Sequence, residues 1–293
     1  MYTKQALRAI GLDGSELSNA QRQALDEQGY FLVEGVYSRA ECREMAEAFD
    51  RLTAIERDKG GHEVHVEPGA PRVSNIFNKT AAYDRCLECK PLLAAAAHLL
   101  GEFKIHGANL RDPLKGQGHQ DLHCDVPKFF KDDWWVANGI LLFDDMTLEN
   151  GPTRLVPGSH LRAPINIPYV NIGDWTPVPL TPEEQKLVPQ DFAKPYPGEI
   201  HVTAPAGSVA ILNSSLWHAG TTNKSGARRR VLHLTYTRRD LPQQLVQRDY
   251  LTRELYERLS PAHRFLMDVE PDQAAAAAPR KSAQRTGAAG WWN

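Results

Sequence analysis

Gly116-Gln-Gly-His-Gln-Asp-Leu-His-Cys-Asp-Val-Pro127 is the stretch on which the interpretation of this 293-residue chain depends. Alternate residues of a β-strand share one face, so its four ionisable side chains would all point the same way. They are His119, Asp121, His123 and Asp125. Such a face suits a core poorly, but a His-x-Asp pair can present an imidazole nitrogen and a carboxylate oxygen to one metal ion. With a distant third ligand, the pair gives a facial site of two histidines and one carboxylate that leaves half of an octahedral shell open.

The third ligand should follow a strand near the end of the same region. His218 meets this condition, because it comes after the apolar run Val209–Leu212. A turn rich in Gly, Asn and Ser follows, and then three consecutive arginines, Arg228 to Arg230. An arginine that opens the next strand would return beside the metal. Its planar guanidinium binds both oxygens of a carboxylate and stays charged, so we expect a carboxylate to bind there.

Short apolar runs separated by Gly, Pro and Asn follow one another from about residue 103. Strands at this density, with little helix between them, predict an antiparallel sandwich or barrel. The runs are Phe103–Leu110, Asp121–Val126, Trp135–Phe143, Thr153–Val156, Ile200–Ala204, Val209–Leu212 and Arg229–Arg238.

Local signals predict helices on both sides of this β-rich region. Ser18-Asn-Ala-Gln21 and Ser38-Arg-Ala-Glu41 have the spacing of capping boxes, which open helices. A strand-like run, Tyr30–Val36, lies between them. Further helices are expected over Lys90–Leu100, Pro182–Leu187 and Tyr250–Met267.

We expect one domain over residues 1–270, because a chain of this length favours one large core over two small ones. It would comprise a helical part (1–102), a β-rich core (103–240) and a C-terminal helix (241–270). The proline-rich segment Leu161–Glu199 is expected to cover a pocket. Residues 271–293 carry an alanine run and scattered basic residues, which predicts a flexible low-complexity tail.

Composition excludes several classes of function. The net charge of -2 provides no broad basic field for nucleic acid or an anionic membrane. No apolar stretch has the length of a transmembrane helix, and the first residues lack the pattern of a signal peptide. Four cysteines in a chain of this length do not form a disulfide framework, so we expect a reducing cytoplasm. The expected partner is a small molecule, and the oligomeric state is left open.

Several motifs resemble the phytanoyl-CoA dioxygenase family of Fe(II)/2-oxoglutarate-dependent oxygenases. The resemblance extends over most of residues 20 to 240, and its most distinctive part is Asn150-Gly-Pro-Thr-Arg-Leu-Val-Pro-Gly-Ser-His160. The other matching stretches are Asp26–Val33, Gln120–Asp125 and His218–Arg229. The resemblance implies a double-stranded β-helix (a cupin-like jelly roll) with flanking helices.

Position by position, the resemblance implies iron ligands at His123, Asp125 and His218. The His-x-Asp pattern also occurs at His119 and Asp121, and strand parity does not separate the two pairs. We prefer the second pair, because the residues before it fit the larger set of family members. His119 and Asp121 remain the alternative.

The resemblance also implies a site for the co-substrate 2-oxoglutarate. Arg229 stands where the family anchors the far carboxylate of this molecule, and Gln120 and Thr153 resemble positions that help to bind it. Gly220 stands where some members have a hydroxyl residue. No catalytic side chain is expected beyond the iron site.

The implied activity is the hydroxylation, or another oxidation, of an unactivated C–H bond in a small organic molecule, with O2 as oxidant and release of succinate and CO2. A cupin-like isomerase and a metal-retaining binding protein without turnover are the alternatives. We interpret His65, His106 and His233 as surface or satisfied core residues, and His160 as a structural residue at the end of a turn.

Overall fold

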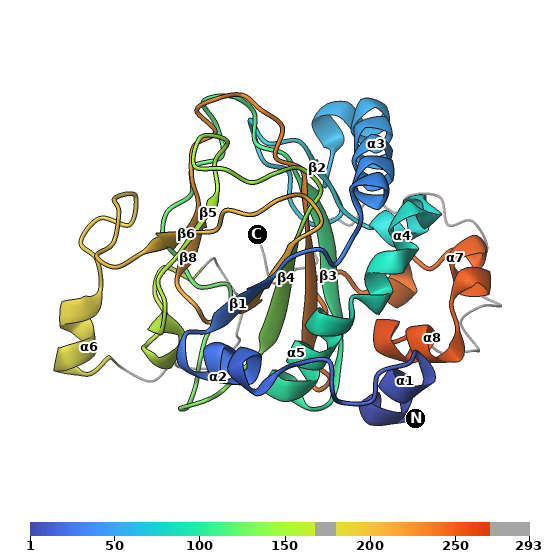
Figure 1. Cartoon of the computed structure of the whole chain (residues 1–293), viewed down its shortest axis with the longest axis horizontal. Coiled ribbons are helices and arrows are strands. Elements are labelled where there is room, and N and C mark those ends of the chain that lie inside the picture. Colours follow the sequence, from blue (N-terminus) through green and yellow to red (C-terminus); the bar gives the residue numbers. More distant parts are fainter. Residues whose placement is uncertain (168–179, 270–293) are drawn as a thin grey trace.

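The computed structural model describes residues 1–167 and 180–269, and in them two antiparallel sheets face each other (Figure 1). The larger sheet has the strand order β1-β7-β4-β9-β3-β2 and the smaller one β6-β5-β8. The arrangement is the jelly roll expected from the sequence. The strands are β1 (Tyr30–Val33), β2 (Arg72–Val73), β3 (Phe103–Arg111), β4 (Val136–Leu142), β5 (Thr153–Leu155), β6 (Ile200–His201), β7 (Val209–Asn213), β8 (His218–Gly220) and β9 (Val231–Arg238).

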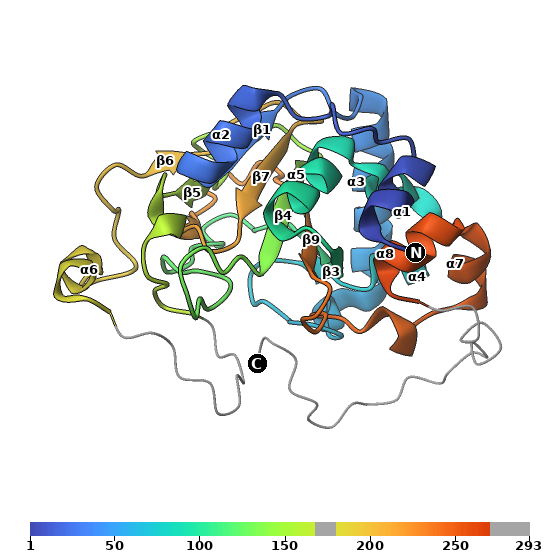
Figure 2. The same ribbon diagram turned by 90° about the horizontal axis from the view of Figure 1, so that it is seen from below.

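Helices cover the outer face of the larger sheet, as Figure 2 shows from below. The α-helices are α1 (Thr3–Ala9), α2 (Asn19–Glu27), α3 (Arg39–Glu56), α4 (Ile76–Lys79), α5 (Lys90–Leu100), α6 (Pro182–Leu187), α7 (Arg253–Arg258) and α8 (Pro261–Met267). Short 3-10 helices lie at Arg57–Lys59, Ala81–Glu88, Ser159–Leu161 and Gln247–Asp249. None of the helices in the described ranges is long and apolar enough to cross a membrane.

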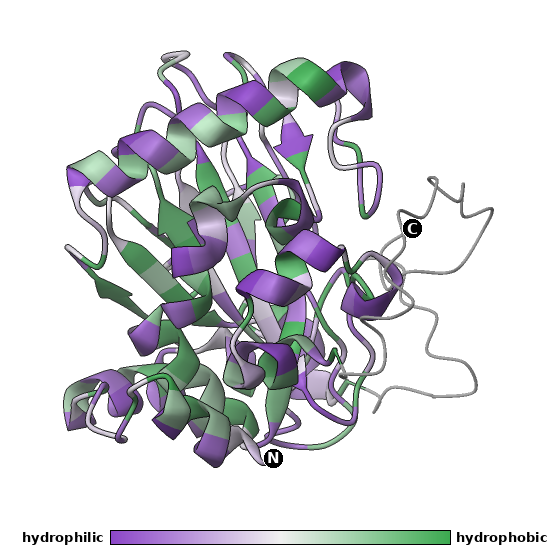
Figure 3. Cartoon of the chain, turned by 90° about the vertical axis from the view of Figure 1, so that its right-hand side faces the viewer, coloured by the Kyte–Doolittle hydropathy of each residue, from purple (hydrophilic) through white to green (hydrophobic). Residues whose placement is uncertain are grey.

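The main hydrophobic core lies between these helices and the outer face of the larger sheet. Seen from the helical side, the helices alternate between hydrophilic and hydrophobic residues, while the strands behind them are mostly hydrophobic (Figure 3). Helix α5 packs against β4 at Gly139, where an added Cβ would lie 2.6 Å from Leu92 Cδ2. Glycine there permits the close approach of helix and strand.

The inner face of the same sheet is polar at one end, and its strand register places the polar residues in rows. Arg72 on β2 is directly opposite Arg111 on β3. His233 on β9 is opposite Asn109 on β3. Two residues further along β9, Thr235 is opposite Asn138 on β4, which lies on the same face. The described cavity is built around these rows.

Most elements lie where local signals predict them. Ser18 and Ser38 cap α2 and α3 with the expected capping boxes. The bounds of α5 and α6 agree with the predicted ones. The predicted helix over Tyr250–Met267 is wrong as one element, since it divides into α7 and α8 before Pro261. The tail expected over 271–293 lies outside the described residues.

The strand predicted over Asp121–Val126 is also wrong. The segment forms only an isolated bridge between His123 and His218. Gly116 and Gly118, with φ of +75° and +94°, turn the chain before it, so a regular strand does not form. The four ionisable residues of this stretch therefore do not share one face.

Candidate metal centre and cavity

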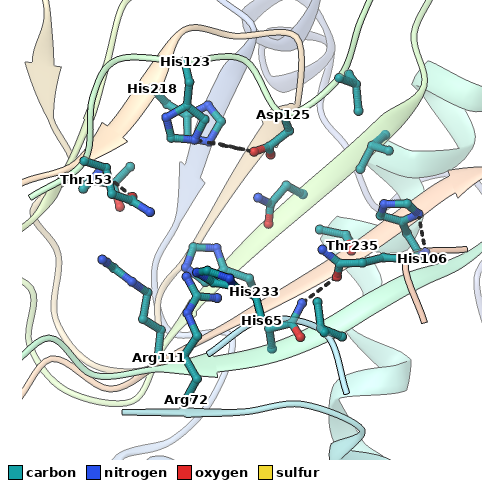
Figure 4. A pocket seen from close by; sticks show the side chains of 18 of the residues that line it. His65, Arg72, His106, Arg111, His123, Asp125, Thr153, His218, His233 and Thr235 are labelled. Atoms are coloured by element: carbon teal, nitrogen blue, oxygen red, sulfur yellow. Dashed lines mark hydrogen bonds and ion pairs between the residues drawn. The ribbon is translucent and has the colours of Figure 1, made fainter. Parts of the chain in front are cut away.

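His123, Asp125 and His218 converge on one point at the edge of the cavity (Figure 4). The Nε2 atoms of His123 and His218 lie 3.7 and 3.4 Å from Asp125 Oδ1. One potential ligand atom from each of the three side chains lies within 4.8 Å of the other two. Two imidazole nitrogens and one carboxylate oxygen in this arrangement can occupy one face of an octahedral metal ion.

Hydrogen bonds to the backbone orient both imidazole rings. His123 Nδ1 donates to Asp121 O at 2.7 Å, and His218 Nδ1 donates to Leu216 O at 2.8 Å. A carbonyl oxygen only accepts, so each Nδ1 carries the proton and each Nε2 keeps its lone pair. This outer hydrogen bond is the usual partner of a histidine that binds a metal through its other nitrogen.

The backbone fixes the spacing of the trio. His123 and His218 exchange two N–H···O bonds, of 3.0 and 2.9 Å, across antiparallel segments. The Asp125 amide donates to Ser214 O at 3.1 Å, in the turn that leads into β8. Residues 95 positions apart in the chain thus approach as a hydrogen-bonded strand pair, with ring centroids 4.5 Å apart.

The electrostatics of the trio favour an anionic carboxylate beside neutral imidazole. Burial and the neighbouring His218 lower the pKa of His123 to about 4. Burial opposes ionisation of Asp125, but His218 and His123 outweigh it and lower the pKa of the carboxyl group. For His218, Asp125 outweighs burial and raises the pKa of the imidazole. A divalent cation would replace the proton that this pair shares.

The alternative pair lies apart from this trio. The side chains of His119 and Asp121 are 46% and 59% exposed, against 16% and 17% for His123 and Asp125. His119 Nε2 lies 3.9 Å from Asp121 Oδ1, and neither residue joins a group of three potential ligands in the described chain. The structure therefore brings the preferred pair, and not the alternative pair, to His218.

A second group of potential ligands, formed by Glu56, His62 and Glu63, already has a cation. Lys79 Nζ lies 2.5 Å from Glu56 Oε1 and 2.6 Å from Glu63 Oε1. The ammonium group neutralises the carboxylates, so this group does not indicate a metal site.

Arg229 and Thr153 lie together in the wall of the cavity, on β5 and just before β9. The Arg229 side chain is buried, and its Nη2 donates to Thr153 Oγ1 at 2.9 Å. Its Nε and Nη1 have no hydrogen-bond partner among the described residues. Burial and the nearby Arg111 lower the pKa of Arg229 to about 9, so the group stays charged at neutral pH. A buried guanidinium with two free donors is costly unless an anion binds it.

Gln120 and Gly220 form the adjoining part of the wall. Gln120 Oε1 accepts from the Gly220 amide at 2.9 Å, which ties the loop to β8. A Cβ at position 220 would lie 2.7 Å from Gly118 O and 3.1 Å from Arg111 Nη1. The space that a hydroxyl side chain would need is therefore filled by the backbone and by Arg111.

Beyond these residues, the cavity has a volume of about 690 Å³ and includes residues that the sequence did not single out. Among the lining residues are His65, His106 and His233, so interpreting them as surface or satisfied core residues misses their position. Arg72, Arg111, Asn109, Asn138 and Thr235 also line it. The strand register brings them together, and no local motif marks it.

His160 lies outside this cavity. It is buried, and its Nε2 donates to Asp26 O at 3.0 Å. Asn150 likewise bonds to the backbone, at Asp145 O and Arg228 O. Both residues of the distinctive motif hold the chain in place and do not reach the metal centre.

A model of the family described as phytanoyl-CoA dioxygenase (PhyH) matches residues 25–231, well over half of the chain. This chain belongs to the phytanoyl-CoA dioxygenase family. The predictions of this family, of its jelly-roll fold and of a dioxygenase are thereby confirmed.

Two relatives in the family have assigned activities. The chain is 26% identical over 234 residues to the ectoine dioxygenase of Bordetella parapertussis, which covers 71% of each chain. It is 28% identical over 210 residues to the L-proline trans-4-hydroxylase of Streptomyces griseoviridis, covering 64% of this chain and 75% of the relative.

Solved structures share the fold at lower identity. EctD from S. alaskensis, crystallised with bound Fe, superposes with a TM-score of 0.59 and 21% identity over 78% of this chain and 80% of that one. HygX from Streptomyces hygroscopicus, with nickel and 2-oxoglutarate bound, gives a TM-score of 0.58 and 14% identity over 78% of this chain and 89% of that one.

Proposed function

We propose that this protein is an Fe(II)- and 2-oxoglutarate-dependent dioxygenase that hydroxylates an unactivated C–H bond of a small organic molecule. The balanced reaction converts substrate, 2-oxoglutarate and O2 into hydroxylated product, succinate and CO2. One observation carries the proposal: the trio His123, Asp125 and His218 borders the same cavity as Arg229, a buried guanidinium with two free donors.

Each of these side chains has a defined part in the proposal. His123 and His218 would hold iron through Nε2, and Asp125 through a carboxylate oxygen, which leaves the opposite face of the ion open. Arg229 Nε and Nη1 would bind the far carboxylate of 2-oxoglutarate, while Thr153 holds the guanidinium in position. Gln120 would support the same corner through its bond to Gly220. The iron, when bound, supplies the activation of O2.

The cavity also restricts water at the proposed centre. The side chains of the trio are only 12 to 17% exposed. Segments from three parts of the chain meet around them, with Val64 and His65 on one side and Val126 and Asn166 on another. A site of this kind protects a reactive centre from side reactions with solvent. The four cysteines are free and buried, which supports a reducing compartment, and we propose the cytoplasm.

The proposal is tested without knowledge of the substrate. Anaerobic protein is mixed with Fe(II) and 2-oxoglutarate, and the weak visible charge-transfer band of the chelate is recorded. Air is then admitted and succinate is measured. A band followed by succinate formation supports the dioxygenase. A band without any succinate would identify a binding protein, and the absence of both would favour a cupin-like isomerase.

The ligand assignment is tested separately by two histidine variants. We expect His123→Ala to abolish the iron-dependent band, because it removes one of the three converging ligands. The matched variant His119→Ala should keep it, since that side chain is exposed and outside the trio. Metal content after anaerobic loading provides a second readout. The opposite result would move the ligand pair to His119 and Asp121.

The role of Arg229 is tested by Arg229→Gln. The variant keeps a donor near Thr153 but loses the charge, so the KM for 2-oxoglutarate should rise by roughly two orders of magnitude, or about 3 kcal/mol. Arg253→Gln, at an exposed position on α7, is the control. An unchanged KM in Arg229→Gln would show that another group binds the co-substrate.

A further inference from the structure

The wall of the cavity away from the metal centre carries a cluster of basic side chains. Figure 4 shows Arg72, Arg111, His65 and His233 gathered on that side, across from the His123–Asp125–His218 trio. The two arginines are direct cross-strand partners on β2 and β3. Like charges directly opposite each other destabilise a strand pair, so this pair has a cost that the fold alone does not explain.

One carboxylate, that of Glu67, lies between the two guanidiniums. Arg72 reaches Glu67 Oε2 through Nε at 2.7 Å and Nη2 at 2.6 Å. Arg111 reaches the same carboxylate through Nε at 2.9 Å and through Nη2. Two guanidiniums and one carboxylate leave this group of three side chains with one net positive charge.

The hydrogen-bonding capacity of the two arginines is also incomplete. Arg111 Nη2 has a further acceptor in Gly118 O at 3.2 Å. The Nη1 atoms of Arg72 and Arg111 form no hydrogen bond with another residue of ranges 1–167 and 180–269. Both residues line the cavity, so an anion there would find a net charge and free donors.

The nearest other carboxylate does not meet this need. Asp112 accepts from Arg228 Nε and from the Arg229 backbone amide. Arg229 is set aside for the far carboxylate of 2-oxoglutarate in the proposed function. The single excess charge of the Arg72–Glu67–Arg111 group therefore fits a further anion with one negative charge, as in a carboxylate, better than a phosphate dianion.

A second unsatisfied group lies further along the same wall. Asn138 is 6% exposed, and its Oδ1 has no hydrogen-bond partner in the described chain. It faces the cavity beside Thr235, whose hydroxyl donates to Gly107 O. A buried amide oxygen without a partner is costly, and a ligand N–H or O–H would satisfy it.

We propose, on the basis of the proposed function, that the substrate is a compact carboxylic acid that also carries an N–H or O–H donor, such as an amino or hydroxy acid. Arg72 and Arg111 bind its carboxylate, and Asn138 accepts its donor. The cavity must also contain the co-substrate within about 690 Å³, which leaves room for a small molecule only.

Acid and amide pairs test this assignment. The iron-loaded full-length enzyme is given 2-oxoglutarate, O2 and a panel of amino acids and compact 2-hydroxy acids, each beside its primary amide. We expect at least one acid to raise succinate formation tenfold or more above the level without substrate, with a hydroxylated product, while its amide does not. Equal stimulation by acid and amide, or stimulation by none of the acids, would overturn the inference. If succinate forms without substrate in either case, the proposed function stands; if none forms at all, the proposed function fails first.

Variants of Arg72 then locate the carboxylate. Arg72→Gln should lower the ratio of acid-stimulated to amide-stimulated succinate formation at least tenfold, whereas Arg253→Gln should leave this ratio unchanged. Arg72→Lys keeps the charge that balances Glu67, and it replaces Arg72→Gln if that variant does not fold; it should lower the same ratio by a smaller factor. An unchanged ratio together with a raised KM for 2-oxoglutarate would assign the cluster to the co-substrate and overturn the proposal.

Discussion

Gly220 illustrates how a single residue limits the site. A Cβ at this position would lie 2.7 Å from Gly118 O, a backbone atom, and 2.9 Å from Gln120 Oε1. We expect Gly220→Ser to displace the Gln120 loop and to raise the KM for 2-oxoglutarate roughly tenfold, a loss of about 1.4 kcal/mol. Steady-state succinate kinetics measure the effect, with the exposed Ala193→Ser as control. A lower KM would mean that the serine hydroxyl supplies a hydrogen bond to the co-substrate instead.

At the same scale, the sequence reveals some residues of the candidate site and hides others. His123, Asp125, His218 and Arg229 stand in recognisable local patterns, so they could be selected before the structure was known. Arg72 and Arg111 lie in no motif. They meet because β2 pairs with β3 in one particular register, which no local signal specifies.

Among the elements, α5 and β4 show how packing supports the sheet that bears the cavity. Leu92 on α5 is fully buried against Gly139 on β4. Leu92→Ala should lower the free energy of unfolding by about 2 to 5 kcal/mol, because it leaves a void between helix and sheet. Chemical denaturation measures this loss, and Leu187→Ala, at a 40% exposed position on α6, should change stability by less than about 0.5 kcal/mol. A loss below about 1 kcal/mol at Leu92 would show that the helix repacks.

Helices were predicted more accurately than the metal-binding segment for a physical reason. Caps such as Ser18 and Ser38 bond within their own first turn, so the information that starts a helix is local. The segment from Asp121 to Val126 depends on partners far along the chain, chiefly at His218 and Ser214. Strand alternation therefore could not show that His119 and Asp121 leave the cavity while His123 and Asp125 enter it.

On the scale of the whole molecule, Glu67 connects the segment before β2 to the larger sheet. Its carboxylate bonds Arg111 on β3 as well as Arg72 on β2, and its side chain is 15% exposed. The same three residues form the basic wall of the cavity. Stability and substrate recognition are therefore coupled here, because any change that frees one arginine alters both the fold and the charge of the pocket.

This coupling predicts a pH dependence of stability. Burial opposes ionisation of Glu67, but Arg111 and Arg72 outweigh it and lower the pKa to about 2, from 4.5. The lowered pKa means that the contribution is complete above about pH 4.5 and is lost as the pH falls toward 2; its full size is on the order of 3 kcal/mol. Denaturant titrations of wild type and Glu67→Gln should therefore differ most near pH 7 and clearly less at pH 3.5. Glu183→Gln, on the exposed face of α6, should show no such trend. A difference between wild type and Glu67→Gln that stays constant over this range would mean that the ionised carboxylate does not hold the two arginines together.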